Sequence, residues 1–404
     1  MPEAALADVK ILDLMWAIAG PAATRMLADY GAVIVRVESP KHTDICRTIM
    51  PFHELPPESE SAVLFHNMNA GKRMLTLDLG TPAGREVLLD LVRWADVVTE
   101  AYSAGTMQAM GLDYEALRAV NPSLIMLSTC LMGQTGPLAR YAGFGNLAHS
   151  ITGFGALCGW PDRAPAGPFG AYTDYIAPRF SAAVILAALD HRRRTGEGQF
   201  IDLAQAEASL HFLAPAILDY TVNGRIRSAH GNADDEAAPH GVYPAAGDDR
   251  WIAIAVHDDA QFAGLASVLG DDGLTRDPRF ASGAARRANV AALDAAITAW
   301  TAVRDAHAAE AALQAAGVPA AVVAGSAELC ADPQLIHREH VRRLAHPTYG
   351  TTPVENARSL LSRTPAVVAG DAPTLGRDNY EVLAAILGYD DDRISELVAA
   401  GALG

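Results

Sequence analysis

Short apolar runs and helical repeats take turns along the first 135 residues of the chain. The apolar runs predict strands, and they lie at residues 9–14, 32–39, 73–79, 97–102 and 123–131. The segments between them have helical spacing, as in residues 21–30, which Gly31 can terminate. Because the strands are apolar on both faces, they are typical of a parallel sheet covered by helices. The pattern predicts an α/β fold with a doubly wound sheet in this part of the chain.

The alternation stops at residues 133–170, which are rich in Gly, Pro and aromatic side chains. Such a composition predicts a long loop region over a site. A helix is expected at 175–194, and a strand followed by another helix is expected within 199–220.

A second pattern begins after residue 222. Residues 223–240 are polar and rich in Gly, Asp and Asn, which is typical of a linker. Residues 241–256 have the turn-flanked pattern of an antiparallel hairpin. Helices are expected at 258–269 and 290–316, with a strand after the second of them, so this region predicts a small α+β domain.

The remaining tail has a proline-rich stretch and an amphipathic last helix. We expect it to return to the large domain. The predicted division is a large Rossmann-like domain that begins with residues 1–222, a linker and small α+β domain at 223–340, and a C-terminal segment at 341–404.

Composition narrows the possible partners. Acidic residues (47) outnumber basic ones (31), and the net charge of −16 disfavours nucleic acid and anionic membranes. No uncharged apolar stretch reaches the length of a spanning helix, and the N-terminal segment carries acids rather than a basic flank. The four cysteines are scattered, which favours reduced thiols over a metal site. We therefore expect a cytoplasmic protein without a metal.

Several common enzyme motifs are missing. The sequence contains no GxSxG, GxxxxGK(S/T) or HExxH motif. The first turn after a strand is Ala19-Gly20-Pro21 rather than GxGxxG, so a dinucleotide dehydrogenase is not favoured. His337 and His340 have the spacing of a metal pair, but no third ligand accompanies them, which favours a solvated helix end.

Four basic residues and one acid remain as candidates. Lys72 and Arg73 precede a predicted strand, and Arg36 and Lys41 flank the end of another; both pairs fit phosphate binding or a solvated turn equally well. Asp174 lies between a Gly-rich loop and an apolar helix. It fits an N-terminal helix cap, or a carboxylate that points into a cleft, and the two interpretations are compatible.

Several segments together resemble the class III CoA-transferases, the family of formyl-CoA and carnitine CoA-transferases and of α-methylacyl-CoA racemases. The resemblance runs from about residue 8 to 400, and within the family it is strongest to the benzylsuccinate-type branch. The segments that carry it are 9–40, 69–84, 96–125, GQTGP at 133–137, YTD at 172–174, 186–204, 238–256, GVPAA at 317–321 and ADPQL at 331–335.

The resemblance implies an activity and a site. Asp174 matches the aspartate that attacks an acyl-CoA thioester to form a mixed anhydride and then an aspartyl-CoA thioester, without ATP or metal. Backbone N–H groups of the Gly-rich loops would stabilise the oxyanions. The residues expected at the CoA site are Ala19, Leu77, Leu79, Tyr102 and Met110, with Arg73 as a basic candidate.

Three departures from the family pattern affect the details of CoA binding. A Glu-Asn pair is replaced by Glu100-Ala101, and the basic residue after the second strand is Ser39. The glycine-rich loop that covers the anhydride in some members has no counterpart, since residues 232–238 read NADDEAA.

Two other functions are compatible with this resemblance. An α-methylacyl-CoA racemase needs a second acid/base, whose histidine belongs near Gly143 or Phe144; no ionisable side chain stands there, and His149 is out of register. A catalytically silent CoA-binding protein would lack the nucleophile, but Asp174 is present. CoA transfer is the favoured function.

The resemblance also suggests substrates and an assembly. Succinyl-CoA is the expected donor, and larger aromatic or dicarboxylic acids are the expected acceptors. Aromatic side chains in the 140–170 region fit an apolar acceptor pocket or loop anchors equally well; they are Tyr141, Phe144, Phe154, Trp160 and Phe169. Family members form an interlocked homodimer, for which the polar segments near 200–240 and 330–350 offer long connections. The active site would then lie between the large domain of one chain and the small domain of the other.

Overall fold

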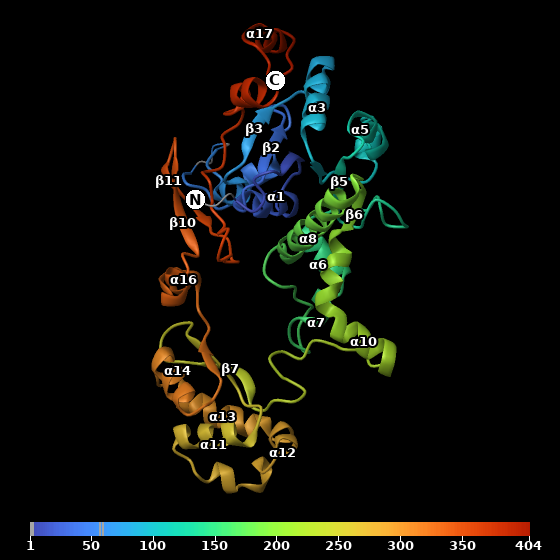
Figure 1. Cartoon of the computed structure of the whole chain (residues 1–404). Helices are drawn as coiled ribbons and strands as arrows, with labels where there is room; N and C mark the ends of the chain where they lie inside the picture. Colours follow the sequence, from blue (N-terminus) through green and yellow to red (C-terminus); the bar gives the residue numbers. More distant parts are fainter. Residues whose placement is uncertain (1–3, 56–57, 59) are drawn as a thin grey trace. The chain divides into compact units, whose positions relative to one another are not determined.

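The computed structural model describes residues 4–55, 58 and 60–404 (Figure 1). The chain forms two compact units. The first comprises Met1–Ala156, Ala166–Arg227 and Gln334–Gly404, and the second comprises Leu157–Pro165 and Ser228–Pro333. The division into functional domains at 222/223 and 340/341 stays a prediction.

A six-stranded parallel sheet forms the centre of the first unit, with the strand order β3-β2-β1-β4-β5-β6. The strands are β1 (Lys10–Leu14), β2 (Val33–Glu38), β3 (Arg73–Thr76), β4 (Val97–Glu100), β5 (Ile125–Cys130) and β6 (Phe200–Ala204). The predicted parallel α/β fold is therefore confirmed. The order reverses between β1 and β4, which is where such sheets open a crevice at the carboxyl ends of their strands.

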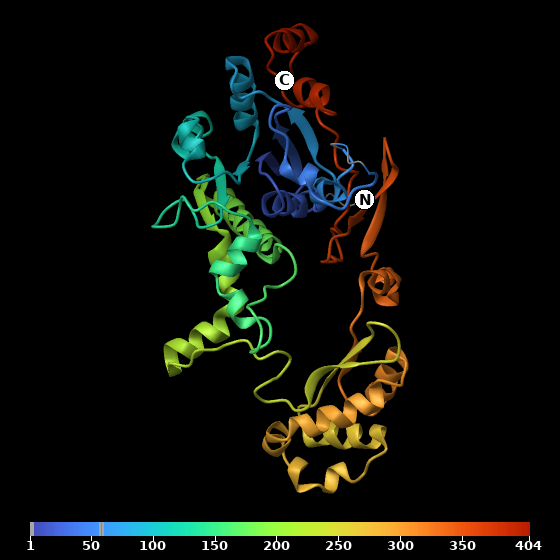
Figure 2. The same ribbon diagram turned by 180° about the vertical axis from the view of Figure 1, so that it is seen from behind.

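Helices cover both faces of this sheet (Figures 1 and 2). On one face, Leu12 and its neighbours pack against α3 (Pro82–Trp94), α5 (Tyr114–Val120) and the C-terminal α17 (Asp391–Ala399). On the other face, Ile11 and its neighbours pack against α1 (Ala19–Asp29) and α8 (Tyr172–Thr195). Consecutive residues point to opposite faces of a strand, so a strand buried on both sides must be apolar throughout.

The start of α1 lies close against the end of β1. A Cβ on Gly20 would stand 2.6 Å from Cβ of Met15, so only glycine permits this approach. The turn from Trp16 to Ala19 is thereby held at the carboxyl end of the sheet.

The edge strand β3 is completed by residues from the end of the chain. The N–H of Met74 donates to Asp378 (2.8 Å), and the N–H of Thr76 donates to Asn379 (2.9 Å). Just beyond the strand, the N–H of Asp78 donates to the carbonyl of Ala402 at 2.8 Å. These bonds occupy the strand edge that would otherwise be open.

The region predicted as a long loop, 133–170, contains two short helices, α6 (Gly145–Ile151) and α7 (Phe154–Leu157). The helix predicted at 175–194 starts earlier, at Tyr172. The other short helices of the first unit are η1 (Ile45–Thr48), α2 (Val63–Asn69), α4 (Thr106–Ala109), α9 (Gln205–Leu210), η2 (His211–Leu213), α10 (Ala214–Asn223) and η5 (Glu381–Ile386).

The second unit contains the predicted antiparallel hairpin, β7 (His240–Pro244) and β8 (Trp251–Ala255), extended by β9 (Ala320–Val322). The expected helix at 290–316 is two helices, because Asp305 caps a new one by accepting a bond from the N–H of Ala308. The helices of this unit are α11 (Asp259–Leu269), η3 (Leu274–Arg276), η4 (Pro278–Phe280), α12 (Gly283–Ala288), α13 (Val290–Thr301), α14 (Ala306–Ala315) and α15 (Ser326–Ala331).

The C-terminal part contains a hairpin that the sequence pattern did not predict. After α16 (Pro333–His337), β10 (Val341–His346) pairs antiparallel with β11 (Gly350–Glu355). Arg342 and His346 point to the more buried side of β10, so the usual alternation of apolar and polar residues is obscured. Among the helices that the structure describes, none has the length and apolar character needed to cross a bilayer.

Candidate active site

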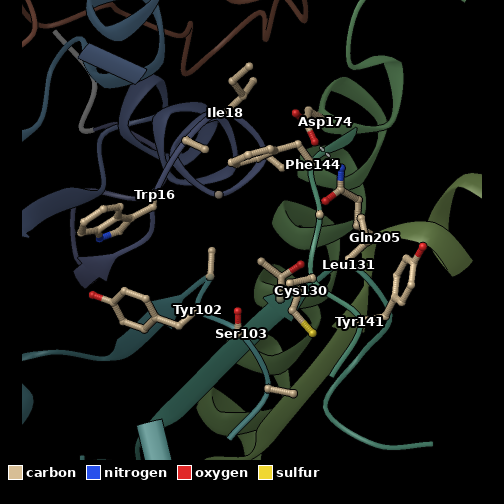
Figure 3. Close-up of a pocket in the computed structure, with 18 of the residues that line it drawn as sticks. Trp16, Ile18, Tyr102, Ser103, Cys130, Leu131, Tyr141, Phe144, Asp174 and Gln205 are labelled. Atoms are coloured by element: carbon tan, nitrogen blue, oxygen red, sulfur yellow. Dashed lines mark hydrogen bonds between the residues drawn. The ribbon is translucent and has the colours of Figure 1, made fainter. Parts of the chain in front are cut away.

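A cavity of about 400 Å³ opens at the carboxyl ends of β1, β4 and β5. The segments that follow these strands form most of its wall, and Asp174 and Gln205 complete it (Figure 3). The lining residues are 16–20, 45, 101–104, 129–131, 139–144, 174 and 205. The cavity therefore lies beside the strand-order reversal, where ligands bind in open α/β sheets, and its size is that of a small-molecule site.

Asp174 lies in the first turn of α8, with 6% of its surface exposed. Burial raises the pKa of its carboxyl from 3.8 to about 6, although hydrogen bonds from the Gln205 amide and the Gly145 backbone act in the opposite direction. The helix-cap interpretation is wrong, because the residue that caps α8 is Ala171. The carboxylate instead lies at the cavity wall beside Phe144 and Gln205 (Figure 3).

Three helix starts meet around this carboxylate. Gln205, the first residue of α9, bonds to Thr173 Oγ1 at 3.0 Å as well as to Asp174. The Thr173 hydroxyl donates to the carbonyl of Gly145, the first residue of α6, at 3.1 Å. A Cβ on Gly145 would stand 2.5 Å from Asp174 Oδ1, so glycine is required for the backbone to reach the carboxylate. This arrangement fixes the position of Asp174 and supplies two hydrogen-bond donors beside it.

Gln205 and Gly145 were not predicted from the sequence. The available signal for Gln205 was its position directly after the last parallel strand, at the functional edge of the sheet. Gly145 gave no signal, since its role depends on a contact with a residue 29 positions away.

Aromatic side chains provide much of the remaining wall. The rings of Trp16 and Tyr102 lie 6.2 Å apart, and burial raises the pKa of Tyr102 to about 12, so its phenol is neutral. Burial also raises the pKa of Cys130, which keeps its thiol protonated. Tyr141 and Phe144 line the cavity as well (Figure 3). Asp174 is therefore the candidate nucleophile of the cavity.

The other aromatic residues of this region lie elsewhere. Phe154 is buried and contacts Tyr172 edge-on, with ring centroids 5.7 Å apart. Phe169 is fully exposed. Trp160 belongs to the second unit, where it lines a separate cavity of about 380 Å³ with residues 232–234 of the NADDEAA segment.

The residues expected to bind CoA are divided between the cavity and the core. Ala19 and Tyr102 line the cavity. Leu77 is buried in the apolar core, Leu79 and Met110 pack against that core, and none of the three lines the cavity. Arg73 pairs with Glu381 at 2.7 Å and is also outside the cavity wall. The CoA-binding roles of all six residues stay predictions.

Two of the basic candidates are structural. Lys72 is buried, and its ammonium donates to Asp13 Oδ2 and to the carbonyl of Pro21, both at 2.9 Å. Arg36 is also buried and pairs with Asp44 at 2.5 Å. Neither is available to a phosphate, because each charge is neutralised within the core. Lys41 is exposed and pairs with Asp78.

The structure also shows where the residues that depart from the family pattern lie. Ala101 lines the cavity, whereas the Glu100 carboxylate accepts bonds from the Ser128 hydroxyl and from the N–H of Tyr102 (2.7 Å). Burial raises the pKa of Glu100 to about 7. Gly143 and Phe144, the positions at which a racemase would carry its histidine, are at the cavity wall. His149 is not.

No group of three or more histidine, cysteine or acidic side chains within residues 4–55, 58 and 60–404 is placed to hold a metal ion. His337 and His340 therefore have no further ligand among these residues.

A family model described as CoA-transferase family III matches residues 6–379. The chain belongs to this family. Succinyl-CoA–D-citramalate CoA-transferase of Chloroflexus aurantiacus is 35% identical over 398 residues, which are 98% of each chain. Succinate–glutarate CoA-transferase of Agrobacterium fabrum is 34% identical over 94% of this chain and 95% of the relative.

Solved structures agree with this assignment. A CaiB/BaiF family protein from Brucella suis superimposes with a TM-score of 0.87 at 34% identity, over 96% of this chain and 99% of that one. The predicted membership of the class III CoA-transferases is thus confirmed, and with it the prediction that the chain is an enzyme of that class.

Proposed function

We propose that this class III CoA-transferase moves CoA from succinyl-CoA to a carboxylic acid through covalent intermediates on Asp174. The observation that carries this proposal is the Asp174 carboxylate at the wall of the cavity, buried and held by the amide of Gln205 and the backbone of Gly145. A carboxylate with few surrounding waters is a better nucleophile than a solvated one, and its covalent participation divides a difficult transfer into easier steps.

The proposed reaction consists of four substitutions at carbonyl carbon. A carboxylate oxygen of Asp174 attacks the thioester, the C–S bond breaks, and CoA thiolate leaves a mixed anhydride. The thiolate attacks the aspartyl carbonyl and releases the free donor acid, which gives an aspartyl-CoA thioester. The acceptor carboxylate attacks this thioester, its C–S bond breaks, and CoA thiolate leaves a second anhydride. The thiolate then attacks the acceptor carbonyl, which yields the new acyl-CoA and restores the Asp174 carboxylate.

Each step passes through a tetrahedral oxyanion beside Asp174. The Gln205 amide and the Gly145 backbone N–H already point at the Asp174 oxygens, so they are the donors best placed to stabilise the oxyanions formed at the aspartyl carbonyl. One such donor contributes about 3–4 kcal/mol in comparable sites.

The names of the relatives support the choice of substrates. The two relatives described above are named for succinyl-CoA or succinate and for citramalate or glutarate, all of them dicarboxylic acids or their CoA esters. We therefore propose a dicarboxylic acceptor. Benzylsuccinate, which the resemblance to the benzylsuccinate-type branch suggests, is also a dicarboxylic acid.

The racemase alternative needs a second acid/base across the substrate from Asp174. Among the described residues that line the cavity there is no histidine, and Asp174 is the one carboxylate. CoA transfer is consequently the better supported function.

We also propose that the protein works as an interlocked homodimer, as its resemblance to the family implies. The exposed apolar side chains of α10 support an interface between copies; they are Ile217, Leu218, Tyr220 and Val222. Sedimentation velocity tests this proposal, and a monomer at micromolar concentration would contradict it.

Intact-protein mass spectrometry tests the chemistry. Wild-type protein incubated with succinyl-CoA alone should gain the mass of CoA or of the succinyl group, and hydroxylamine should convert Asp174 into a hydroxamate. Asp174→Asn should give neither product while still binding CoA. An active preparation that gains no mass and forms no hydroxamate would overturn the covalent mechanism.

A further inference from the structure

The cavity wall carries only two charged side chains among the described residues. One is Asp174, the proposed nucleophile, and the other is Arg140, in the loop after β5. The other lining side chains are apolar, aromatic or neutral polar. A positive charge is therefore present in a cavity whose proposed chemistry needs only the carboxylate.

The guanidinium of Arg140 has neither an ion pair nor a hydrogen bond within the described part of the chain, and the residue is exposed. Two buried arginines of the same unit differ in this respect: Arg36 pairs with Asp44, and Arg47 pairs with Glu38 and Glu60. In a chain with a net charge of −16, an arginine without an acidic partner at a cavity wall favours an anionic ligand.

We propose that Arg140 binds the distal carboxylate of a dicarboxylic substrate whose other carboxyl group reacts at Asp174. This inference rests on the proposed function and names the substrate class of the same site. The planar guanidinium matches a carboxylate in two parallel hydrogen bonds, which a lysine would not provide. The site therefore selects diacids and their CoA half-esters over monocarboxylic acids of equal length.

One arginine suffices for donor and acceptor. In the proposed mechanism each acyl group in turn is joined to Asp174 as an anhydride, so both distal carboxylates are presented from the same attachment point. A donor and an acceptor that both carry a distal carboxylate can therefore bind Arg140 one after the other.

The phosphates of CoA are the other anionic groups that an arginine could bind. They are separated from the thioester by the whole pantetheine arm, whereas Arg140 and Asp174 line one cavity of about 400 Å³. This geometry favours the substrate carboxylate, and the experiment distinguishes the two sources.

The test compares two matched reactions in wild type and Arg140→Met. The first uses succinyl-CoA with glutarate, and the second uses butyryl-CoA with pentanoate, which are of equal length but lack the distal carboxylate. We expect Arg140→Met to lower kcat/KM about 10- to 100-fold for the first reaction and to leave the second within about twofold, since a hydrogen-bonded charge is lost only in the first. Arg140→Lys should recover part of the loss.

Arg118→Gln is the matched control, because Arg118 is exposed, pairs with Glu115 on α5 and does not line the cavity. It should leave both reactions unchanged. If Arg140→Met lowers kcat/KM equally in both reactions and no longer binds CoA more tightly than dephospho-CoA in calorimetry, Arg140 binds a CoA phosphate. That result would overturn the inference. Unchanged kinetics in both reactions would also overturn it.

Failure of the proposed function is distinguishable from failure of this inference. If wild type forms no covalent adduct with succinyl-CoA, the mechanism on Asp174 is wrong. Calorimetric binding of glutarate to wild type and Arg140→Met then still decides the role of Arg140, because binding needs no reaction. Equal glutarate affinity of the two proteins would contradict the inference.

Discussion

The carboxylate of Asp44 accepts a hydrogen bond at 2.9 Å from the N–H of Ala17, a residue with a φ of +61°. This left-handed conformation is unfavourable for alanine by about 1–2 kcal/mol, so the surrounding contacts must maintain it. Asp44 also caps η1 through the N–H of Cys46 and pairs with the buried Arg36. The turn from Trp16 to Ile18, which lines the cavity, is therefore held by a buried ion pair.

Asp44→Ala is expected to destabilise the protein by about 3–5 kcal/mol, because it leaves Arg36 buried with less charge compensation. Chemical denaturation monitored by circular dichroism measures this loss. Asp44→Asn keeps an oxygen for the N–H of Ala17 and should cost less than the alanine variant. Equal stability of wild type and Asp44→Ala would contradict the role assigned to this pair.

Gly145→Ala should lower kcat at least about 100-fold, because the added Cβ would stand 2.5 Å from Asp174 Oδ1 and must displace the carboxylate. Gly155→Ala in α7 is the matched control, since a Cβ there meets no atom within 4 Å. Steady-state kinetics and a thermal melt of both variants separate activity from folding. A Gly145→Ala enzyme with wild-type kcat would show that the close approach is not needed.

The acid limb of kcat/KM should have an apparent pKa of about 6, since Asp174 attacks only when ionised and its pKa is raised to about 6 by burial. Activity then rises with pH up to neutrality. Gln205→Leu removes a hydrogen bond that lowers this pKa, so its limb should move to higher pH. An acid limb with the same apparent pKa in wild type and Gln205→Leu would contradict its assignment to the ionisation of Asp174.

Asp174→Asn should stabilise the protein at pH 8 by up to about 3 kcal/mol while abolishing transfer. The native carboxyl has a pKa of about 6 against an ordinary 3.8, so the native state holds this proton more tightly than the unfolded chain. Wild-type stability therefore decreases as the pH rises from about 4 to about 6, and asparagine lacks this dependence. Chemical denaturation should give wild type and Asp174→Asn the same free energy of unfolding at pH 4. At pH 8 it should show that the variant is more stable.

The parallel sheet was predictable because its strands carry their signal locally, as uninterrupted apolar runs between helical repeats. The role of Asp174 came from a resemblance, since its sequence alone favoured a helix cap. Interactions between distant segments gave no local signal. Lys72 reaches Asp13, 59 residues away, so a lysine expected near the surface is part of the core. Gln205 and Gly145 likewise acquire their roles only when three helix starts meet.

The pairing of β3 with residues 378–402 also has a consequence for synthesis of the protein. Val382, Leu383 and Leu397 complete the apolar layer over a sheet whose first strand begins at Lys10. During synthesis the six strands of this sheet are complete at Ala204, whereas the bonds to the edge of β3 come from residues 378–402. Closure of the first unit must therefore wait for that later segment, and until then an apolar strand edge stays open to other chains and to chaperones.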